Sequence, residues 1–154
     1  MIKTAKNNFL FLTLGIVILG FSCTKVSDEP AFDTQPQIEL LSISMDTVLQ
    51  FIHPINLKIK YKDGDGDLGN GDPDVNSIFF QDQRLEKEDS YYLAPLAPED
   101  AKLSIEGILD IEIAPPFLLG NGSTEKTTFE LYLVDRAGNK SNVIQTEVIT
   151  ILKE

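Results

Sequence analysis

The sequence predicts an all-β fold, an antiparallel β-sandwich of about seven strands. Several segments alternate apolar and polar residues with a period of two, and clusters of glycine, proline and asparagine separate them at sandwich-like spacing. No segment has the apolar period of about 3.6 residues that marks a convincing helix. A small β-barrel fits the same pattern and stays open as the alternative. The chain has 154 residues, 42% of them hydrophobic, so one packed domain is expected.

The first strand signals precede an acidic loop. Residues 37–48, QIELLSISMDTV, alternate loosely, with Ile38 and Met45 among the candidates for inward-facing side chains. Residues 55–63, INLKIKYKD, alternate cleanly, which is typical of a strand with one buried and one wet face. The apolar face consists of Ile55, Leu57, Ile59 and Tyr61, and the polar face consists of Asn56, Lys58, Lys60 and Lys62.

The remaining strand signals follow that loop. Residues 76–84, NSIFFQDQR, predict another strand, and residues 87–102, with two prolines between two polar ends, predict a long connection with a short edge strand. Residues 107–117 alternate again. Residues 127–135 and 143–151 flank the segment RAGNKSN, and this arrangement is a strong hairpin signal.

The first 22 residues have the pattern of a lipoprotein signal peptide. Lys3 and Lys6 precede the apolar run FLFLTLGIVILGF, which is shorter than the ~20 residues of a membrane-spanning helix. Cys23, the only cysteine, follows directly after Ser22 and resembles the lipid-accepting cysteine of bacterial lipoproteins. We therefore expect residues 1–22 to be removed and Cys23 to anchor the chain to a membrane. An ordinary signal peptide or a short uncleaved anchor is the alternative.

The expected organisation behind the signal peptide is a tether and one domain. Residues 23–36 are polar and contain two prolines, so they predict a lipidated cysteine with a flexible tether, and residues 37–154 predict the β-sandwich. Within the tether, residues 27–29, SDE, resemble the acidic export signals of surface lipoproteins of Bacteroidota. A merely solvated linker explains the same residues equally well.

Two further motifs carry a resemblance that covers most of the predicted domain. Residues 133–142, LVDRAGNKSN, resemble the ending of the penultimate strand in bacterial immunoglobulin-like and fibronectin-III-like modules. Together with residues 61–69, YKDGDGDLG, they make the chain similar to small surface lipoproteins of Bacteroidota. The resemblance implies an immunoglobulin-like sandwich and an exported protein anchored to the outer membrane, on its periplasmic or its cell-surface side. It implies no activity.

The acidic loop predicts a calcium site. Asp63, Asp65 and Asp67 alternate with glycines, so that alternate carboxylates can point to one place. Two unit charges about 4 Å apart cost roughly 4 kcal/mol at an effective dielectric of about 20, so either the loop splays into water or a cation sits among the oxygens. Hard oxygen ligands select calcium over softer metals. The second-choice ligands are Asp72, Asp74 and the Gly69 carbonyl, and a solvated acidic turn is the alternative.

The loop begins like an EF-hand and then departs from it. The EF-hand pattern has glycine at its sixth position, where this chain has Leu68, and Gly69 comes one residue late. At the twelfth position Asp74 replaces the bidentate glutamate. A predicted strand precedes the loop, and no helix flanks it. The loop is therefore expected to be nearer to the short calcium loops that join strands in extracellular modules.

Asp135 is a candidate for a second contribution to the site. In an immunoglobulin-like sandwich the second and sixth strands run in the same direction, so the loops after them share one pole. If residues 55–63 and 127–135 are these strands, Asp135 lands beside the acidic loop, and Asn139 adds an amide oxygen nearby. The alternative is that Asp135 only caps its own turn.

Charge and residue types limit the function. The net charge of −11 argues against nucleic acid as a partner. His53, the only histidine, has no second soft ligand for zinc and no evident nucleophile to activate. The carboxylates Glu106, Asp110 and Glu112 are expected on a wet strand face, so they do not indicate a glycosidase pair. We expect no enzymatic activity.

Three functional classes stay open. The first is a calcium-stabilised cell-envelope lipoprotein with a non-enzymatic binding, adhesion or structural role. The second is an accessory glycan-binding lipoprotein of a surface uptake system, with Tyr91 and Tyr92 as the only aromatic pair suited to stacking on a sugar; packing of these rings on the core is the alternative. The third is a β-sandwich without metal. The sequence leaves the protein or glycan partner and the oligomeric state open.

Overall fold

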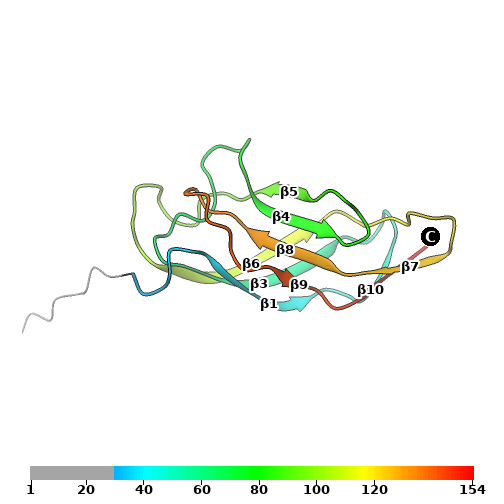
Figure 1. Cartoon of the computed structure of the whole chain (residues 1–154). Helices are drawn as coiled ribbons and strands as arrows, with labels where there is room; N and C mark the ends of the chain where they lie inside the picture. Colours follow the sequence, from blue (N-terminus) through cyan, green and yellow to red (C-terminus); the bar gives the residue numbers. More distant parts are fainter. Residues whose placement is uncertain (1–29) are drawn as a thin grey trace, which may run out of the picture.

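The computed structural model describes residues 30–154, and the predicted signal peptide, Cys23 and the SDE segment lie outside this range. Every regular element of residues 30–154 is a β-strand, which confirms the all-β prediction (Figure 1). This part of the chain has no helix with the length and hydrophobicity needed to cross a membrane. The ten strands are β1 (Gln37–Ile43), β2 (Thr47–Leu49), β3 (Ile55–Asp63), β4 (Asn76–Asp82), β5 (Asp89–Tyr92), β6 (Ile105–Ile113), β7 (Thr124–Thr127), β8 (Phe129–Leu133), β9 (Ile144–Gln145) and β10 (Ile149–Leu152).

The strands form three hydrogen-bonded sheets. Their orders are β1-β3-β6, β5-β4-β8-β9 and β2-β10-β7. Among the strand pairs of residues 30–154, β2 and β10 alone run parallel, and the other pairs are antiparallel. In Figure 1 the four-stranded sheet lies over the β1-β3-β6 sheet, and β7 and β10 extend from one end. This layered arrangement is consistent with the predicted sandwich.

One apolar core joins the three sheets. In β3, Ile55, Leu57 and Ile59 are buried while the residues between them reach the surface, so the period of two in the sequence indicates the inward face correctly. On the facing sheet, Phe80 of β4 and Phe129 of β8 stack with ring centroids 4.9 Å apart. The other buried apolar side chains of this core are Ile38, Val48, Leu68, Ile78, Ile111, Ile113, Leu131, Leu133, Ile149 and Ile151.

The structure has ten strands where about seven were expected, because two predicted strands are split and the short strand β7 was not predicted. Residues 37–48 divide into β1 and β2 around Met45, whose side chain is 37% exposed and does not face inward. Residues 143–151 divide into β9, which pairs with β8, and β10, which pairs with β7 in another sheet. The predicted strand 127–135 corresponds to β8, and β7 precedes it, sharing only Thr127 with the prediction. A strand that changes sheets keeps its alternation of apolar residues, so the sequence pattern does not reveal the break.

The loops gather at two poles (Figure 1). One pole holds the acidic loop after β3, the connection from β5 to β6 and the turn after β8, and residues 30–36 enter the domain there. The predicted hairpin is confirmed, because β8 and β9 pair antiparallel on either side of that turn. The other pole holds the β2–β3 loop, the β6–β7 connection and the C-terminus. The acidic loop therefore lies at the pole where the described chain begins.

Candidate metal centre

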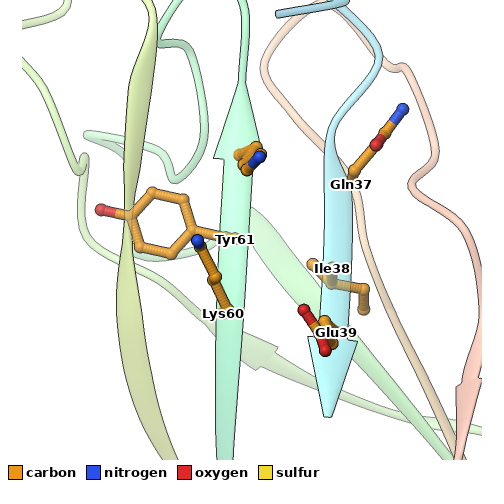
Figure 2. A pocket seen from close by; sticks show the side chains of 6 residues that line it. Gln37, Ile38, Glu39, Lys60 and Tyr61 are labelled. Atoms are coloured by element: carbon orange, nitrogen blue, oxygen red, sulfur yellow. The ribbon is translucent and has the colours of Figure 1, made fainter. Parts of the chain in front are cut away.

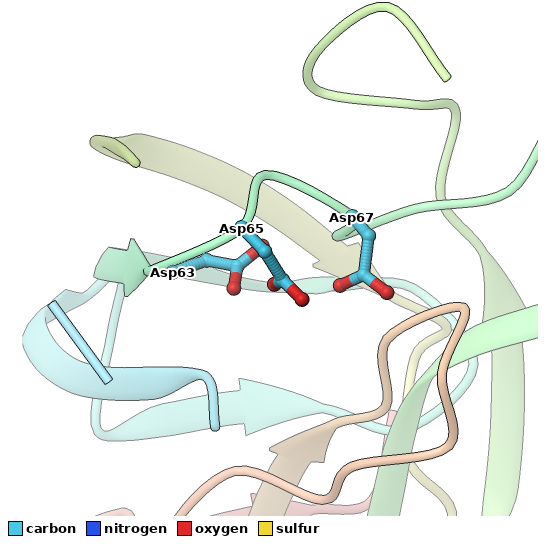
Figure 3. A group of neighbouring side chains, drawn as sticks. All are labelled: Asp63, Asp65 and Asp67. Carbon is cyan, nitrogen blue, oxygen red and sulfur yellow. The ribbon is translucent and has the colours of Figure 1, made fainter. Parts of the chain in front are cut away.

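The carboxylates of Asp63, Asp65 and Asp67 converge on one side of the loop after β3 (Figure 3). One oxygen from each residue lies within 4.8 Å of the corresponding oxygens of the other two. Asp63 is the last residue of β3 and is fully buried, while Asp65 and Asp67 are half-buried. The loop with alternating aspartate and glycine therefore holds its three carboxylates close together and partly buried, and they do not point separately into solvent.

The loop is fixed to the core by Leu68, which is fully buried. The Leu68 backbone N–H donates to Oδ2 of Asp63 at 3.1 Å, and the Leu68 carbonyl accepts from the N–H of Leu96 at 3.1 Å. Gly66 has a φ of +74°, and a Cβ at that position would come within 2.5 Å of the Leu103 carbonyl oxygen. A glycine is required there for both conformation and space. The EF-hand position that would be glycine is instead the hydrophobic anchor of this loop.

Each of the three carboxylates retains a buried oxygen without a partner. Oδ1 of Asp63, of Asp65 and of Asp67 is inaccessible to solvent and has no hydrogen bond. The protein supplies a backbone donor to the other oxygen of two of these carboxylates: Leu68 to Asp63, and the Ala137 N–H to Oδ2 of Asp67 at 3.0 Å. Buried charged oxygens without partners are costly, and a bound cation is the simplest way to satisfy three of them together.

The pKa values of Asp63 and Asp67 are raised, as expected for buried carboxylates that repel one another. Burial raises the pKa of Asp63 to about 6, and the neighbouring Asp65 and Asp67 contribute to the increase against the opposing Leu68 N–H. Burial also raises the pKa of Asp67, with added repulsion from Asp135 and Asp65; the Ala137 N–H and Arg136 act against this increase. Without a cation, ionisation of Asp63 and Asp67 is therefore less favourable in the folded protein than in the unfolded chain.

The turn after β8 meets the acidic loop, as two loops at a shared pole should. The backbone N–H of Arg136 donates to the Asp67 carbonyl at 3.2 Å. The Arg136 guanidinium donates to the carbonyls of Gly69 at 3.0 Å and of Gly66 at 3.4 Å. Arg136 thus ties three points of the loop backbone to the turn and places a positive charge beside the cluster.

Asp135 lies near the cluster and also caps its own turn. Its carboxylate accepts hydrogen bonds from the backbone N–H of Asn139 at 2.7 Å and from Nδ2 of Asn139 at 2.9 Å. Its charge contributes to the raised pKa of Asp67, so the two side chains interact. Asp135 is nevertheless outside the group whose oxygens lie within 4.8 Å of one another. The structure therefore makes it a neighbour of the cluster.

The second-choice ligands of the sequence prediction are not among the three grouped carboxylates. Asp72 and Asp74 are exposed, and the Asp74 N–H donates to Oδ1 of Asp72 at 3.0 Å, which is a local turn contact. The Gly69 carbonyl already accepts the Arg136 hydrogen bond. Asn70 also shapes the turn, since its Oδ1 accepts from the Asp72 N–H at 2.9 Å. The cluster that the structure supports consists of the three aspartates Asp63, Asp65 and Asp67.

An open pocket of about 390 Å³ gives access to the cluster from solvent. Asp65 and Asp67 form part of its wall, and the charged side chains of Glu99, Lys102 and Arg136 lie around it. Solvent therefore lies beside Asp65 and Asp67, although the Oδ1 atoms themselves stay covered. Sequence reasoning missed Lys102 and Glu99, because only the folded chain brings the β5–β6 connection beside a loop about thirty residues earlier.

Asp110, Glu106 and His53, which the sequence also singled out, make ordinary structural contacts. Asp110 lies 3.1 Å from Lys58 and Glu106 lies 3.5 Å from Lys60 on the exposed face of the β3–β6 pair. His53 Nδ1 accepts from the Leu49 N–H at 3.2 Å, which closes the β2–β3 loop.

Neither the Tyr91–Tyr92 pair nor the hollow over β1 and β3 forms a binding site comparable to the aspartate cluster. Tyr91 packs against the core, whereas Tyr92 is exposed, so the two rings do not share one open face. The hollow over β1 and β3 has a volume of only about 160 Å³ (Figure 2). There the ring of Tyr61 reaches across to Gly107 of β6, where a Cβ would collide with its hydroxyl. This contact fills the space over a strand glycine.

Comparisons with protein-family models, with curated proteins and with solved structures found no match to the chain.

Proposed function

We propose that the protein is a calcium-stabilised, immunoglobulin-like module of the cell envelope with a non-enzymatic binding, adhesion or structural role. The observation that carries the cation site is the buried Oδ1 atom without a partner on each of Asp63, Asp65 and Asp67. Lipidation at Cys23 and an outer-membrane location, periplasmic or at the cell surface, are part of the proposal and rest on the N-terminal sequence pattern.

Calcium fits the donors better than other common ions. The cluster offers carboxylate oxygens without histidine or cysteine, and this donor set suits a hard cation. Oxygens bound to one calcium at about 2.3–2.6 Å lie at most about 5 Å apart, and the three aspartate oxygens meet that limit. Calcium takes about six to eight oxygen ligands, so the open pocket beside Asp65 and Asp67 leaves room for water to complete the set.

A solvated acidic turn explains the loop less well. Such a turn keeps its charges in water, whereas Asp63 is fully buried and Leu68 pulls the loop into the core. Asp72 and Asp74 of the same loop are exposed to water, as the carboxylates of a solvated turn would be. For a dissociation constant of order 1 mM, about 10 mM free calcium adds roughly 1.4 kcal/mol to stability, which matters to a small domain that lacks a disulfide.

The immunoglobulin-like form of the sandwich is supported by two features. β2 near the start of the described chain pairs parallel with β10 at its end, and the loops after β3 and β8 meet at one pole. In sandwiches of this class, the loops at one end carry binding functions while the sheets provide a rigid support. This organisation favours the acidic pole as the functional end of the domain.

The experiment that tests the calcium site compares melting temperatures in EDTA and in about 10 mM CaCl₂. We expect calcium to raise the melting temperature of the wild-type chain and to have no effect on the Asp65→Asn/Asp67→Asn variant. The matched control is Asp72→Asn/Asp74→Asn, which removes the same number of charges from the same loop outside the cluster and should keep the calcium response. A wild-type melting curve that is identical in the two buffers contradicts the proposal.

The open pocket favours one alternative, a glycan-binding accessory lipoprotein. Its approach to Asp65 and Asp67 allows vicinal hydroxyls of a sugar to complete the coordination of a bound calcium. Tyr91 is largely occupied by core packing, so a stacking platform contributes little to this alternative. Binding to a glycan array that depends on calcium and is lost in Asp65→Asn/Asp67→Asn supports it, and the absence of binding excludes it.

A further inference from the structure

The segment that leads into the domain crosses directly over the acidic loop. Gly64 stands between Asp63 and Asp65, and a Cβ at this glycine would come 2.3 Å from the Phe32 carbonyl oxygen and 2.6 Å from that of Asp33. Real Cβ atoms do not approach backbone so closely, so a glycine is needed for residues 32–33 to pass. Gly64 therefore has a second role besides separating two aspartates: it seats the incoming chain on the loop.

Ser104 fastens the incoming chain to the loop. Its hydroxyl accepts a hydrogen bond from the Ala31 N–H at 2.8 Å and donates one to the Gly64 carbonyl at 2.9 Å. One side chain just before β6 thus joins residue 31 to the backbone between two candidate ligands. The bond to Gly64 depends directly on the conformation that the loop adopts there.

Further contacts continue this attachment along residues 31–36. Lys62 Nζ lies 5.0 Å from the centre of the Phe32 ring, a cation–π contact. Gln35 Nε2 donates to the Lys140 carbonyl at 2.7 Å, and Pro36 is fully buried. The sequence predicts a flexible tether over residues 23–36, but the last six residues of that range lie against the domain, at the pole that holds the acidic cluster.

We propose that cation occupancy of the acidic loop determines whether residues 31–33 are fastened to the domain, while Gln35 and Pro36 keep their own contacts. The inference rests on the proposed calcium site. Without a cation, repulsion among the three carboxylates acts on both sides of Gly64, the point where the incoming chain and Ser104 hold the loop. A cation draws Asp63 and Asp65 together and keeps the Gly64 carbonyl and its open face in place.

The cation would thereby control the length of free chain between the domain and its predicted anchor. Residues 31–36 join the domain to the predicted anchor at Cys23, and a free chain extends by at most about 3.3–3.6 Å per residue. Release of three residues therefore lengthens the connection by up to about 10 Å. With the cation bound, the acidic pole is held close to the predicted anchor and the opposite pole points away from it. Without the cation, the domain can lie further from the predicted anchor, and its orientation is less restricted.

A single tryptophan makes the fastening measurable. The chain contains no tryptophan, so Phe32→Trp in the full-length chain, kept in detergent, is the sole source of tryptophan fluorescence. We expect calcium to raise its anisotropy and to reduce its quenching by acrylamide relative to EDTA, and we expect this change to be lost on adding Asp65→Asn/Asp67→Asn. Phe117→Trp, an exposed position in the β6–β7 connection at the other pole, is the matched control and should not respond to calcium.

Ser104 provides a variant that separates fastening from cation binding. Ser104→Ala removes the hydroxyl between Ala31 and Gly64, so the calcium response of the Phe32→Trp reporter should be lost while the rise in melting temperature with calcium persists. Ser104→Thr keeps a hydroxyl and should restore the response. Hydrogen–deuterium exchange of the wild-type chain gives a measurement without a reporter, and the Ala31 amide should exchange more slowly with calcium.

The outcomes distinguish the two proposals. A melting temperature that rises with calcium, together with fluorescence and Ala31 exchange that calcium leaves unchanged, overturns the fastening and leaves the calcium site intact. A melting temperature that does not respond overturns the calcium site and the fastening with it. A calcium response of the Phe32→Trp reporter that persists in the Ser104→Ala background overturns the role of Ser104 as the link.

Discussion

Asp63→Asn should stabilise the protein in EDTA and destabilise it relative to wild type in calcium. Burial and the neighbouring aspartates raise the pKa of Asp63 from 3.8 to about 6. One pKa unit corresponds to about 1.4 kcal/mol, so holding Asp63 ionised at pH 7 costs the cation-free fold up to about 3 kcal/mol. Asparagine removes the charge and keeps an oxygen that can accept from the Leu68 N–H, as Oδ2 of the carboxylate does.

The assay is thermal unfolding at pH 7 with EDTA or CaCl₂. For a domain of this size 1 kcal/mol shifts the melting temperature by roughly 3–5 °C, so Asp63→Asn should melt up to about 15 °C above wild type in EDTA. In calcium the order should reverse, because the variant lacks a ligand and gains nothing from the ion. Asp72→Asn, an exposed carboxylate of the same loop, is the control and should leave both values nearly unchanged. If Asp63→Asn melts below wild type in EDTA, the carboxylate is needed for the fold itself and the electrostatic reasoning fails.

Three further predictions follow from the same contacts. Leu68→Ala should cost about 2–5 kcal/mol in a urea titration, because it empties a fully buried position and frees the loop; a loss below about 1 kcal/mol contradicts the anchoring role. Calcium affinity measured by calorimetry should fall as pH decreases through about 6, since protonation of Asp63 removes a ligand; equal affinity at pH 7 and pH 5 excludes it as one. Burial alone would raise the pKa of Asp82, but hydrogen bonds from Arg84 lower it overall, so this pair stabilises the fold above pH ~4 and its contribution disappears as pH decreases further. Arg84→Met should therefore lower the free energy of unfolding by about 3–5 kcal/mol at pH 7 and reduce the loss of stability below pH ~4. A variant as stable as wild type at pH 7 would show that the pair does not stabilise the fold.

The sequence predicts the strands well where one face is buried and the other is wet. Residues 55–63 were expected as one strand and form β3 with the same bounds, because lysines alternate with aliphatic residues along most of its length. The strand β7 was not predictable in this way, because its four residues, Thr124–Thr127, include no apolar side chain that would mark a buried face. Only the pairing of β7 with β10 and of β8 with β4 shows that the chain changes sheets at Thr128.

In the candidate site, too, the sequence predicts the local features and misses the contacts between distant segments. The spacing of Asp63, Asp65 and Asp67 is a local property, and the sequence is sufficient to bring them together. The contributions of Arg136 and Ser104 come from elements far away in the chain, and neither residue type marks such a role. The sandwich topology places the turn after β8 near the loop, but the single hydroxyl that joins residue 31 to Gly64 depends on atomic positions that no sequence pattern encodes.

The acidic loop combines strong charge with deep burial, and its contacts explain how the fold sustains both. Leu68 holds the loop to the core, Arg136 holds it to the turn after β8, and Ser104 holds it to the incoming chain. These attachments fix the backbone while the carboxylates repel one another, so the unfavourable electrostatic energy is confined to one pole and does not disrupt the strands. Apart from Leu68, the buried residues of the apolar core lie in strands, and Asp82 ends β4 away from this loop, so we expect most of the core and the Arg84–Asp82 pair to depend little on the cation. Loss of calcium should therefore loosen the pole where the chain enters before it affects the sandwich, and this order is what a cation-dependent connection to a membrane anchor requires.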